Sequence, residues 1–337
     1  MTPEIKQRIE QIRRGEVPEG YVKKRKVVIP QQWGLPQIKD IASISSGSTP
    51  NRNNSEYWNG NIAWVTTGEL SSGHVNHTSE LITVKAVKET KMRIYPQGTL
   101  LMAMYGQGKT RGTVAILEID AAVNQACAAI TVKDGKSKFL FYQLKNSYQD
   151  IRKLSNTGNQ ENLNADIIKT YQVPWAPDEE QERISTILTT QDKVIELKEK
   201  RLAEKQRQKK YLMQQLLTGK KRLPGFSGEW KNIKLCEVLS ERKEKNVEQN
   251  LRICSVAVQK GVVDQVEHLG RSYAANDTFI SSKLYLPLDV EEQKAIADTF
   301  IAADREIELL QQDIEQEKQK KKALMQLLLT GIVRVKT

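Results

Sequence analysis

A duplication constrains this chain more than any other feature of its sequence. Residues 179–223 and 291–335 align without a gap at an offset of 112, and 18 of the 45 aligned positions are identical. Each copy opens with Glu-Glu-Gln and approaches its end with Leu-Leu-Thr-Gly. Two copies of one structural segment in a single chain predict an architecture in which the same element is used twice.

Each copy has the pattern of a long helix. Neither contains Pro or Gly before Gly219 and Gly331, which stand where a helix ends. Apolar residues recur at seven-residue spacing, which is typical of a coiled-coil seam. The predicted seam consists of Leu188, Ile195, Leu202 and Leu216 in the first helix and Phe300, Ile307, Ile314 and Leu328 in the second. We expect the two helices to lie antiparallel and adjacent, although each could instead pack on its own domain or break near residues 189–192 and 302–305.

The segments before the helices are globular. Trp33 opens one and Trp230 opens the other, within weakly similar motifs. Between residues 31 and 174, strand-like runs such as GTLLMAMYG and TVAILEI alternate with Gly and Asn turns, and a helical pattern follows at 139–154. The chain is therefore predicted to be α+β, with mixed α/β domains joined by two long antiparallel coiled-coil helices. The predicted segments are an N-terminal helix and basic linker (1–30), a first domain (31–176), the first helix (177–223), a short second domain (224–288), and the second helix and tail (289–337).

The charge of the chain indicates an anionic partner. Its net charge is +11 and its sequence pI is about 9.3, which favours nucleic acid, although solvated lysines are the alternative. Cys127, Cys236 and Cys254 form no disulfide framework, and no apolar run is long enough for a membrane span. We therefore expect a cytoplasmic location and no membrane partner.

One motif raises the question of nucleotide chemistry. Residues 103–110, ending Gly108-Lys109-Thr110, fit a relaxed P-loop pattern, but a P-loop must lead into a helix. The residues that follow contain Gly112 and a β-branched run, so they predict a glycine-rich turn between two strands. The sequence shows no metal-binding cluster, no nucleophile–base pair and no cofactor-binding motif, and a binding protein without catalysis is the expectation.

Two polar loops are the predicted binding surface. The turn at 107–111 carries two cations, an amide and a hydroxyl, and the loop at 156–162 is rich in amides. Such side chains suit base edges and phosphates, although they are also ordinary turn residues. The predicted DNA-binding residues are Thr66, Thr67, Tyr105, Gln107, Lys109, Thr110, Arg111, Asn159, Gln160 and Asn162.

The order of these motifs resembles that of the specificity subunits of type I restriction-modification enzymes. The runs GNIAWV, PQGTLL, YG, NQ and GNQENLN resemble successive motifs of a target recognition domain, and Leu216-Leu-Thr-Gly219 resembles the end of the conserved helix. The resemblance covers nearly the whole chain apart from the N-terminal arm. It implies sequence-specific recognition of double-stranded DNA, with paired helices that set the spacing between two half-sites.

The same resemblance implies partners that carry the chemistry. Two modification subunits would bind S-adenosylmethionine and methylate adenine, and restriction subunits would use ATP and Mg²⁺. The chain itself would hold no cofactor and no metal, and would direct methylation and restriction by its partners.

The second domain departs from the pattern of this family. Fewer than 60 residues separate Trp230 from Leu286, and counterparts of the GTLL, YG, NQ and GNQENLN motifs are absent. The sequence therefore predicts a truncated second recognition domain. A degenerate, non-functional specificity subunit, self-association of two copies, and a basic coiled-coil protein-binding adaptor remain as alternatives.

Overall fold

The computed structural model describes residues 2–106, 108–154, 162–234, 237, 254–257, 261–264 and 283–335. The chain divides into two compact units: unit 1 comprises Met1–Glu196 and Glu315–Thr337, and unit 2 comprises Leu197–Ile314. The division falls inside both long helices. The domain boundaries predicted from the sequence lie instead at the ends of the repeat copies, and nothing in the structure tests them.

Two sheets form the centre of unit 1. The five-stranded sheet has the order β3-β10-β7-β8-β5, and the three-stranded sheet has the order β6-β4-β9. In the larger sheet β10 is antiparallel to both β3 and β7, whereas β5 is parallel to β8. The strands of the larger sheet are β3 (Ala42–Ser46), β5 (His74–Val75), β7 (Leu100–Ala103), β8 (Val114–Leu117) and β10 (Cys127–Val132). Those of the smaller sheet are β4 (Trp58–Val65), β6 (Glu80–Ile82) and β9 (Ala121–Val123), and a separate hairpin consists of β1 (Tyr21–Lys24) and β2 (Val27–Pro30).

The short helices of unit 1 connect or cover these strands. They are α1 (Pro3–Arg13), α2 (Ile38–Ile41), α3 (Val84–Thr90), α4 (Ser137–Asn146), α5 (Tyr148–Lys153) and α6 (Ala165–Thr170), with 3₁₀ turns η1 (Ser55–Tyr57), η2 (Thr67–Ser72) and η3 (Lys133–Gly135). Thr2 caps α1, since its hydroxyl accepts from the backbone N–H of Ile5 at 3.4 Å. The helical pattern at 139–154 corresponds to two helices, because the chain leaves the helix at Ser147 and starts another.

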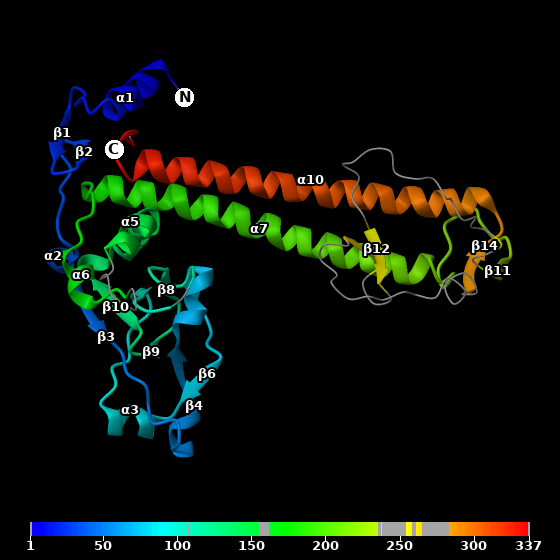
Figure 1. The fold of residues 1–337 in the computed structure, drawn as a ribbon, viewed down its shortest axis with the longest axis horizontal. Coiled ribbons are helices and arrows are strands. Elements are labelled where there is room, and N and C mark those ends of the chain that lie inside the picture. Colours follow the sequence, from blue (N-terminus) through cyan, green and yellow to red (C-terminus); the bar gives the residue numbers. More distant parts are fainter. Residues whose placement is uncertain are drawn as a thin grey trace. The chain divides into compact units, whose positions relative to one another are not determined.

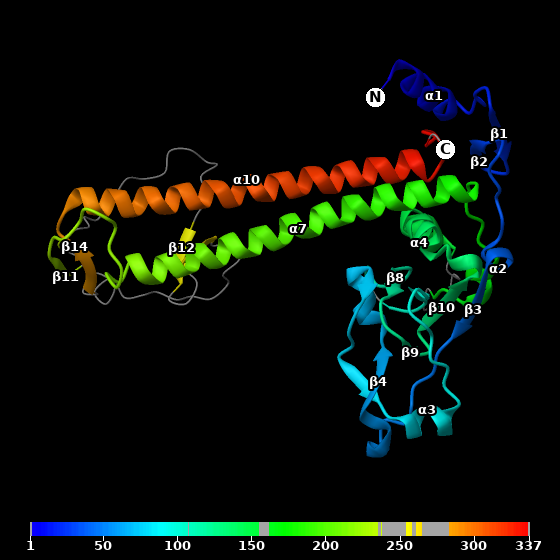
Figure 2. The same cartoon turned by 180° about the vertical axis from the view of Figure 1, so that it is seen from behind.

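Buried strands confirm the strand-like runs of the sequence. Every residue of β7, β8 and β9 is buried, as expected for strands covered on both faces. The helix α4 lies between the larger sheet and α7 (Asp178–Leu216) (Figure 2). One continuous core includes Phe139 and Leu140 of α4 with Leu188 of α7 and Leu329 near the chain end. Unit 1 therefore joins the first domain firmly to one end of each repeat copy.

The duplicated segments are the long helices α7 and α10 (Val290–Leu328) (Figure 1). Both are continuous, so the breaks considered near residues 189–192 and 302–305 do not occur. Gly219 and Gly331 adopt φ of +66° and +70°, the left-handed conformation of a residue that terminates a helix.

Ion pairs between the helices give their direction. Within unit 2, the residue numbers of the partners on α10 decrease as those of the partners on α7 increase, so the helices are antiparallel there. These pairs are Lys198–Asp313, Lys205–Glu306 and Lys209–Asp304. Within unit 1, Asp192 pairs with Lys321 in the same sense. The predicted fold class, mixed α/β structure with two long antiparallel helices, is confirmed.

The predicted seam residues differ in burial. Leu188, Ile195, Leu216, Ile314 and Leu328 are buried, whereas Leu202, Phe300 and Ile307 are half-buried. Charged side chains take some of the intervening inward positions, and Lys321 is only 9% exposed. The helices are therefore held by apolar contacts that alternate with cross-helix ion pairs.

Unit 2 contains the described part of the predicted second domain. There β11 (Trp230–Lys234) pairs with β14 (Lys283–Pro287), and β12 (Cys254–Ala257) pairs with β13 (Gly261–Asp264), both antiparallel. Most of residues 235–282 lie outside the described residues, so the prediction of a truncated domain is untested. Among the helices of the described chain, none is both long and apolar enough to cross a membrane.

Candidate nucleic-acid interface

A glycine-rich turn connects β7 to β8 in unit 1. Gly106 has φ of +132°, and a Cβ there would come within 2.8 Å of the Thr110 Cβ. The N–H of Gly112 donates to the Ala103 carbonyl at 2.8 Å and closes the turn. Because β8 begins directly after it, the turn leads into a strand as predicted, and it lacks the helix that a P-loop requires.

The helix α5 holds this turn by two side chains. The Tyr148 hydroxyl donates to the Lys109 carbonyl at 2.6 Å. The Arg152 Nη1 donates to the Arg111 carbonyl at 2.8 Å and to the Tyr148 oxygen at 3.1 Å. Gly112 permits this approach, since a Cβ there would lie 3.2 Å from the Arg152 Cγ. The turn is therefore anchored through its carbonyls, and Lys109 is left pointing outward from an ordered backbone.

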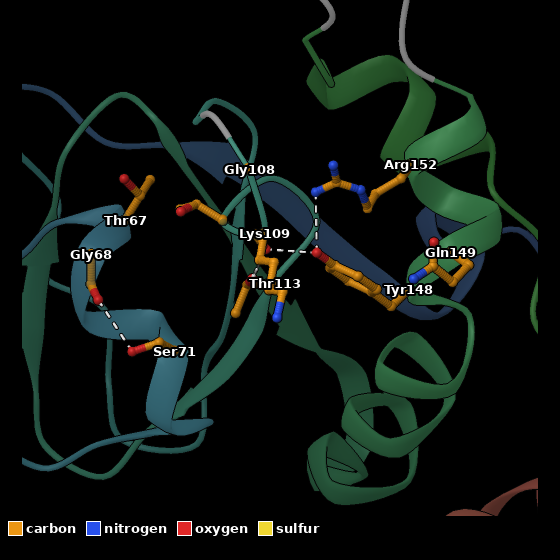
Figure 3. A pocket seen from close by; sticks show the side chains of 10 residues that line it. Thr67, Gly68, Ser71, Gly108, Lys109, Thr113, Tyr148, Gln149 and Arg152 are labelled. Atoms are coloured by element: carbon orange, nitrogen blue, oxygen red, sulfur yellow. Dashed lines mark hydrogen bonds between the residues drawn. The ribbon is translucent and has the colours of Figure 1, made fainter. Parts of the chain in front are cut away.

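A cavity of about 560 Å³ opens between the turn, η2 and α5 (Figure 3). Its lining combines two cations, an amide and several hydroxyls: Thr67, Gly68, Ser71, Gly108, Lys109, Thr110, Thr113, Tyr148, Gln149 and Arg152. No carboxylate lines it among the residues that the structure describes. Such a lining attracts anions and offers several hydrogen-bond donors at once.

The cation Lys109 is the most accessible charge of this lining. Its side chain is exposed, and no hydrogen bond or ion pair links its ammonium group to any other described residue. Arg152 is half-buried and oriented by its bonds to the turn. The cavity therefore has one exposed cation, Lys109, and one cation held by hydrogen bonds, Arg152.

The predicted binding residues divide between this cavity and other places. Thr67, Lys109 and Thr110 line the cavity together, Tyr105 is 41% exposed on the turn, and Asn162 is half-buried beside it. Arg111 is only 7% exposed, contrary to the expectation of a cation that faces DNA, because the turn folds it against the domain. Gln107, Asn159 and Gln160 lie outside the described residues.

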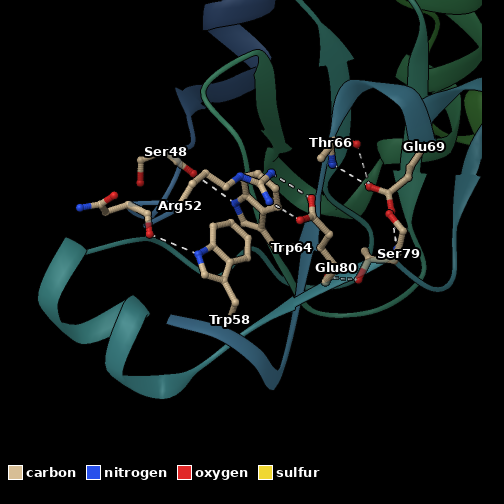
Figure 4. A network of polar contacts seen from close by, with 10 residues as sticks. Ser48, Arg52, Trp58, Trp64, Thr66, Glu69, Ser79 and Glu80 are labelled. Carbon is tan, nitrogen blue, oxygen red and sulfur yellow. Dashed lines mark hydrogen bonds and ion pairs between the residues drawn. The ribbon is translucent and has the colours of Figure 1, made fainter. Parts of the chain in front are cut away.

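Thr66 belongs to a polar network behind η2 (Figure 4). The Glu69 carboxylate accepts from the Thr66 N–H at 2.7 Å and from the Ser79 N–H at 2.7 Å. The Thr66 hydroxyl donates to the same carboxylate at 3.2 Å. Thr66 thus caps η2 and positions Thr67 at the cavity, so its own hydroxyl is already engaged.

A neighbouring cluster stiffens the edge of the smaller sheet. The Arg52 guanidinium lies 4.1 Å from the Trp58 ring centre and 5.0 Å from that of Trp64, and it pairs with both Glu80 oxygens. Hydrogen bonding from Arg52 lowers the pKa of Glu80. Figure 4 shows Arg52 beside the two tryptophans and joined to Glu80. The Arg52 guanidinium is therefore already engaged by Glu80 and by the two tryptophan rings.

Sequence reasoning missed the wall that α5 contributes. Tyr148, Gln149 and Arg152 lie outside every loop that the sequence suggested, in a segment predicted to be plain helix. The only local signal was the spacing of Tyr148 and Arg152, which places both on one face of a helix.

Comparisons with known proteins give the family context of this geometry. Residues 30–206, just over half of the 337 residues, match the family model described as the type I restriction modification DNA specificity domain. The MjaIX type I restriction enzyme specificity subunit of Methanocaldococcus jannaschii is 34% identical over 178 residues, which are 51% of this chain and 40% of that protein. The MjaVIII specificity subunit of the same organism is 26% identical over 212 residues, which are 59% of this chain and 48% of that protein.

The chain therefore spans less than half of the length of these curated relatives. One solved chain, from a study of assembly and conformational transition of the type I R-M system, superposes with a TM-score of 0.56. It is 13% identical, and the match covers 90% of this chain and 99% of that one. At this identity the likeness concerns the fold.

Proposed function

Because this chain belongs to the type I restriction modification DNA specificity family, we propose that it is the DNA-recognition subunit of a type I restriction-modification complex. It would bind double-stranded DNA through the first domain, which lies within the matched residues. Catalysis would belong to other subunits. Modification subunits would bind S-adenosylmethionine and methylate adenine, and restriction subunits would bind ATP and Mg²⁺.

The observation that carries this proposal is the cavity behind the glycine-rich turn. Its lining presents Lys109 and Arg152 with several hydroxyls and no described carboxylate. Phosphate oxygens of a DNA backbone accept hydrogen bonds from such groups, and these contacts orient a protein on the duplex. Gln149 has an amide that could pair with a base edge once the backbone is held.

The test of DNA binding is the salt dependence of affinity in the full-length protein. Lys109→Ala should lower the slope of log affinity against log salt by about one unit, because one phosphate contact is lost. Lys88→Ala is the matched control, since Lys88 is an exposed lysine on α3 outside the cavity. Equal salt slopes for Lys109→Ala and Lys88→Ala would mean that Lys109 does not contact DNA. Binding of the wild type that does not depend on salt would contradict DNA recognition itself.

The outer surface of unit 2 suggests where modification subunits dock. Leu197 and Leu309 occupy equivalent positions of the repeat, and they are 56% and 57% exposed. Burial of such apolar side chains under a docked subunit would remove them from water, which is favourable. One modification subunit on each repeat copy would account for both.

Co-purification tests this docking. Leu197→Glu and Leu309→Glu together should abolish retention of a co-expressed type I modification methyltransferase, while the isolated protein keeps its helix content by circular dichroism. Leu197→Met and Leu309→Met keep an apolar surface and should retain it. Unchanged retention with the two glutamates would place the docking surface elsewhere.

Mapping of methylated sites after co-expression with that methyltransferase tests the whole proposal. An asymmetric bipartite motif would mean that residues 224–288 read a second half-site. A symmetric split motif would indicate two copies of the first domain, and no modified motif would support the degenerate alternative.

A further inference from the structure

The ion pairs between the two repeat copies fall into two classes, and the first class is built from residues that both copies share. In each of these pairs, both members have an identical residue 112 positions away. We name them the reciprocal pairs: Glu180–Arg334 and Asp192–Lys321 in unit 1, and Glu292–Arg222 and Asp304–Lys209 in unit 2. Each copy of the repeat therefore carries both the acid and the base of every reciprocal pair.

The reciprocal pairs set the register of the helices but do not choose the partner. Glu180 and Glu292 are fully buried, so a shift in register would leave a buried carboxylate without its cation. A first-copy helix could, however, pair in the same register with the first-copy helix of a second chain. Arg222 would then meet Glu180 of the second copy, with the same charges as in the present contact.

The second class consists of three pairs in unit 2 that the repeat does not share. Lys198 pairs with Asp313 at 2.8 Å, and Glu306 pairs with Lys205 at 2.8 Å and with Arg201 at 3.9 Å. We name them the central pairs. The repeat places Arg201 at the position equivalent to Asp313, and Val194 at the position equivalent to Glu306. The charges that attract across α7 and α10 are therefore not reproduced between two identical helices.

Pairing of identical helices would set like charges against each other at these positions. Two first-copy helices would bring Lys198 of each against Arg201 of the other, around the twofold axis that relates them. Two second-copy helices would bring Glu306 against Glu317, which is the repeat equivalent of Lys205. Each repulsive contact would occur twice in a symmetric pair, and none occurs when α7 pairs with α10.

We infer that the central pairs make α7 selective for α10 and oppose pairing of either helix with the identical helix of a second copy of this chain. Selectivity of this kind needs a repulsive element against the wrong partner as well as an attractive one for the right partner. The covalent connection also favours pairing within the chain, because it raises the effective concentration. The charges add a preference that can be reversed while the connection stays intact.

This inference does not depend on DNA recognition. It concerns the state of the protein alone: α7 pairs with α10, and the identical helices of two chains do not pair through this surface. Each assembly would then contain one copy of the first domain unless another surface brings chains together.

A single substitution reverses both the attraction between α7 and α10 and the repulsion between two first-copy helices. Lys198→Glu sets a carboxylate against Asp313 within the chain, and against Arg201 when two first copies pair. We expect the full-length variant to dimerise with a dissociation constant about tenfold below that of the wild type, measured by sedimentation velocity over a concentration series. The modest size reflects the partial exposure of both side chains, 26% for Lys198 and 46% for Asp313.

Two further variants make the experiment specific. Lys205→Glu also repels within the chain, against Glu306, but in a first-copy pair it faces Val194, so it should not promote dimers. Lys198→Glu combined with Asp313→Lys restores opposite charges within the chain and should dissociate more readily than Lys198→Glu alone. The inference is overturned if Lys198→Glu dimerises no more tightly than Lys205→Glu, or if the double variant dimerises as tightly as Lys198→Glu.

Discussion

The C-terminal ends of the two repeat copies contain the same residues in different surroundings. In unit 1, Met325 is 8% exposed and Leu329 is 0% exposed. Their repeat equivalents in unit 2, Met213 and Leu217, are 41% and 48% exposed. The residue types are identical, so the difference comes from what packs against each end.

The first domain supplies the cover in unit 1. Trp33 and Phe139 share one core with Leu329, and the Gln143 amide donates to the Leu329 carbonyl at 2.9 Å. In unit 2, Trp230 stands in the motif that matches Trp33 and lies against Gly219, but its Nε1 is buried without a partner among the described residues. A repeat thus supplies an apolar surface, and the domain that docks on it decides whether that surface becomes core.

The largest expected loss of stability comes from replacing the buried glutamates, and it should differ between Glu180 and Glu292. Glu180→Ala removes the acceptor of Arg334 and of the Trp33 N–H, which lies at 2.9 Å, and should cost about 3–5 kcal/mol. Glu292→Ala leaves Arg222 without its carboxylate but affects no tryptophan bond, so it should cost less by about 1–2 kcal/mol. Hydrogen exchange followed by mass spectrometry reports each unit separately. Equal losses would mean that the Trp33 bond adds nothing.

The next effect compares the equivalent leucines. Leu329→Ala opens a cavity in the core of unit 1 and should lower the free energy of unfolding of that unit by about 3 kcal/mol. Leu217→Ala removes a half-exposed side chain and should cost less than about 1 kcal/mol. Denaturant titration with exchange protection of each helix end measures both. A similar loss at Leu217 would show that unit 2 buries this surface in solution.

The smallest effect concerns the two tryptophans. Trp33→Phe leaves Glu180 with one donor fewer and should cost about 1–2 kcal/mol. Trp230→Phe removes an N–H without a described partner and should be close to neutral. The difference in melting temperature between the two variants is the readout. A loss at Trp230 equal to that at Trp33 would indicate a bond that the described residues do not contain.

The candidate interface was only partly predictable. Lys109 and Thr110 were identified because glycines, hydroxyls and cations cluster in the sequence around a turn. Arg111 carries the same charge as Arg152, yet the fold buries Arg111 and turns Arg152 toward the cavity. Nothing in the spacing of residues distinguishes them, because burial depends on the path of a turn held by side chains far along the chain.

The sequence by itself determined the long helices, their ends and the strands beside the turn. These depend on local properties: the absence of Pro and Gly over some 40 residues, glycines at positive φ where the helices end, and β-branched runs between turns. It also contained the reciprocal pairs, since the same acids and bases recur at one offset.

Only the tertiary structure decided which equivalent surfaces are covered and which cations face the cavity. Tyr148 reaches the Lys109 carbonyl across 39 residues of chain, and Gln143 reaches Leu329 across 186. Contacts of this range depend on how sheets and helices pack together, and a residue's own sequence neighbours do not specify that packing. For this reason Leu217 and Leu329, identical in type and in repeat position, differ in exposure from 48% to 0%.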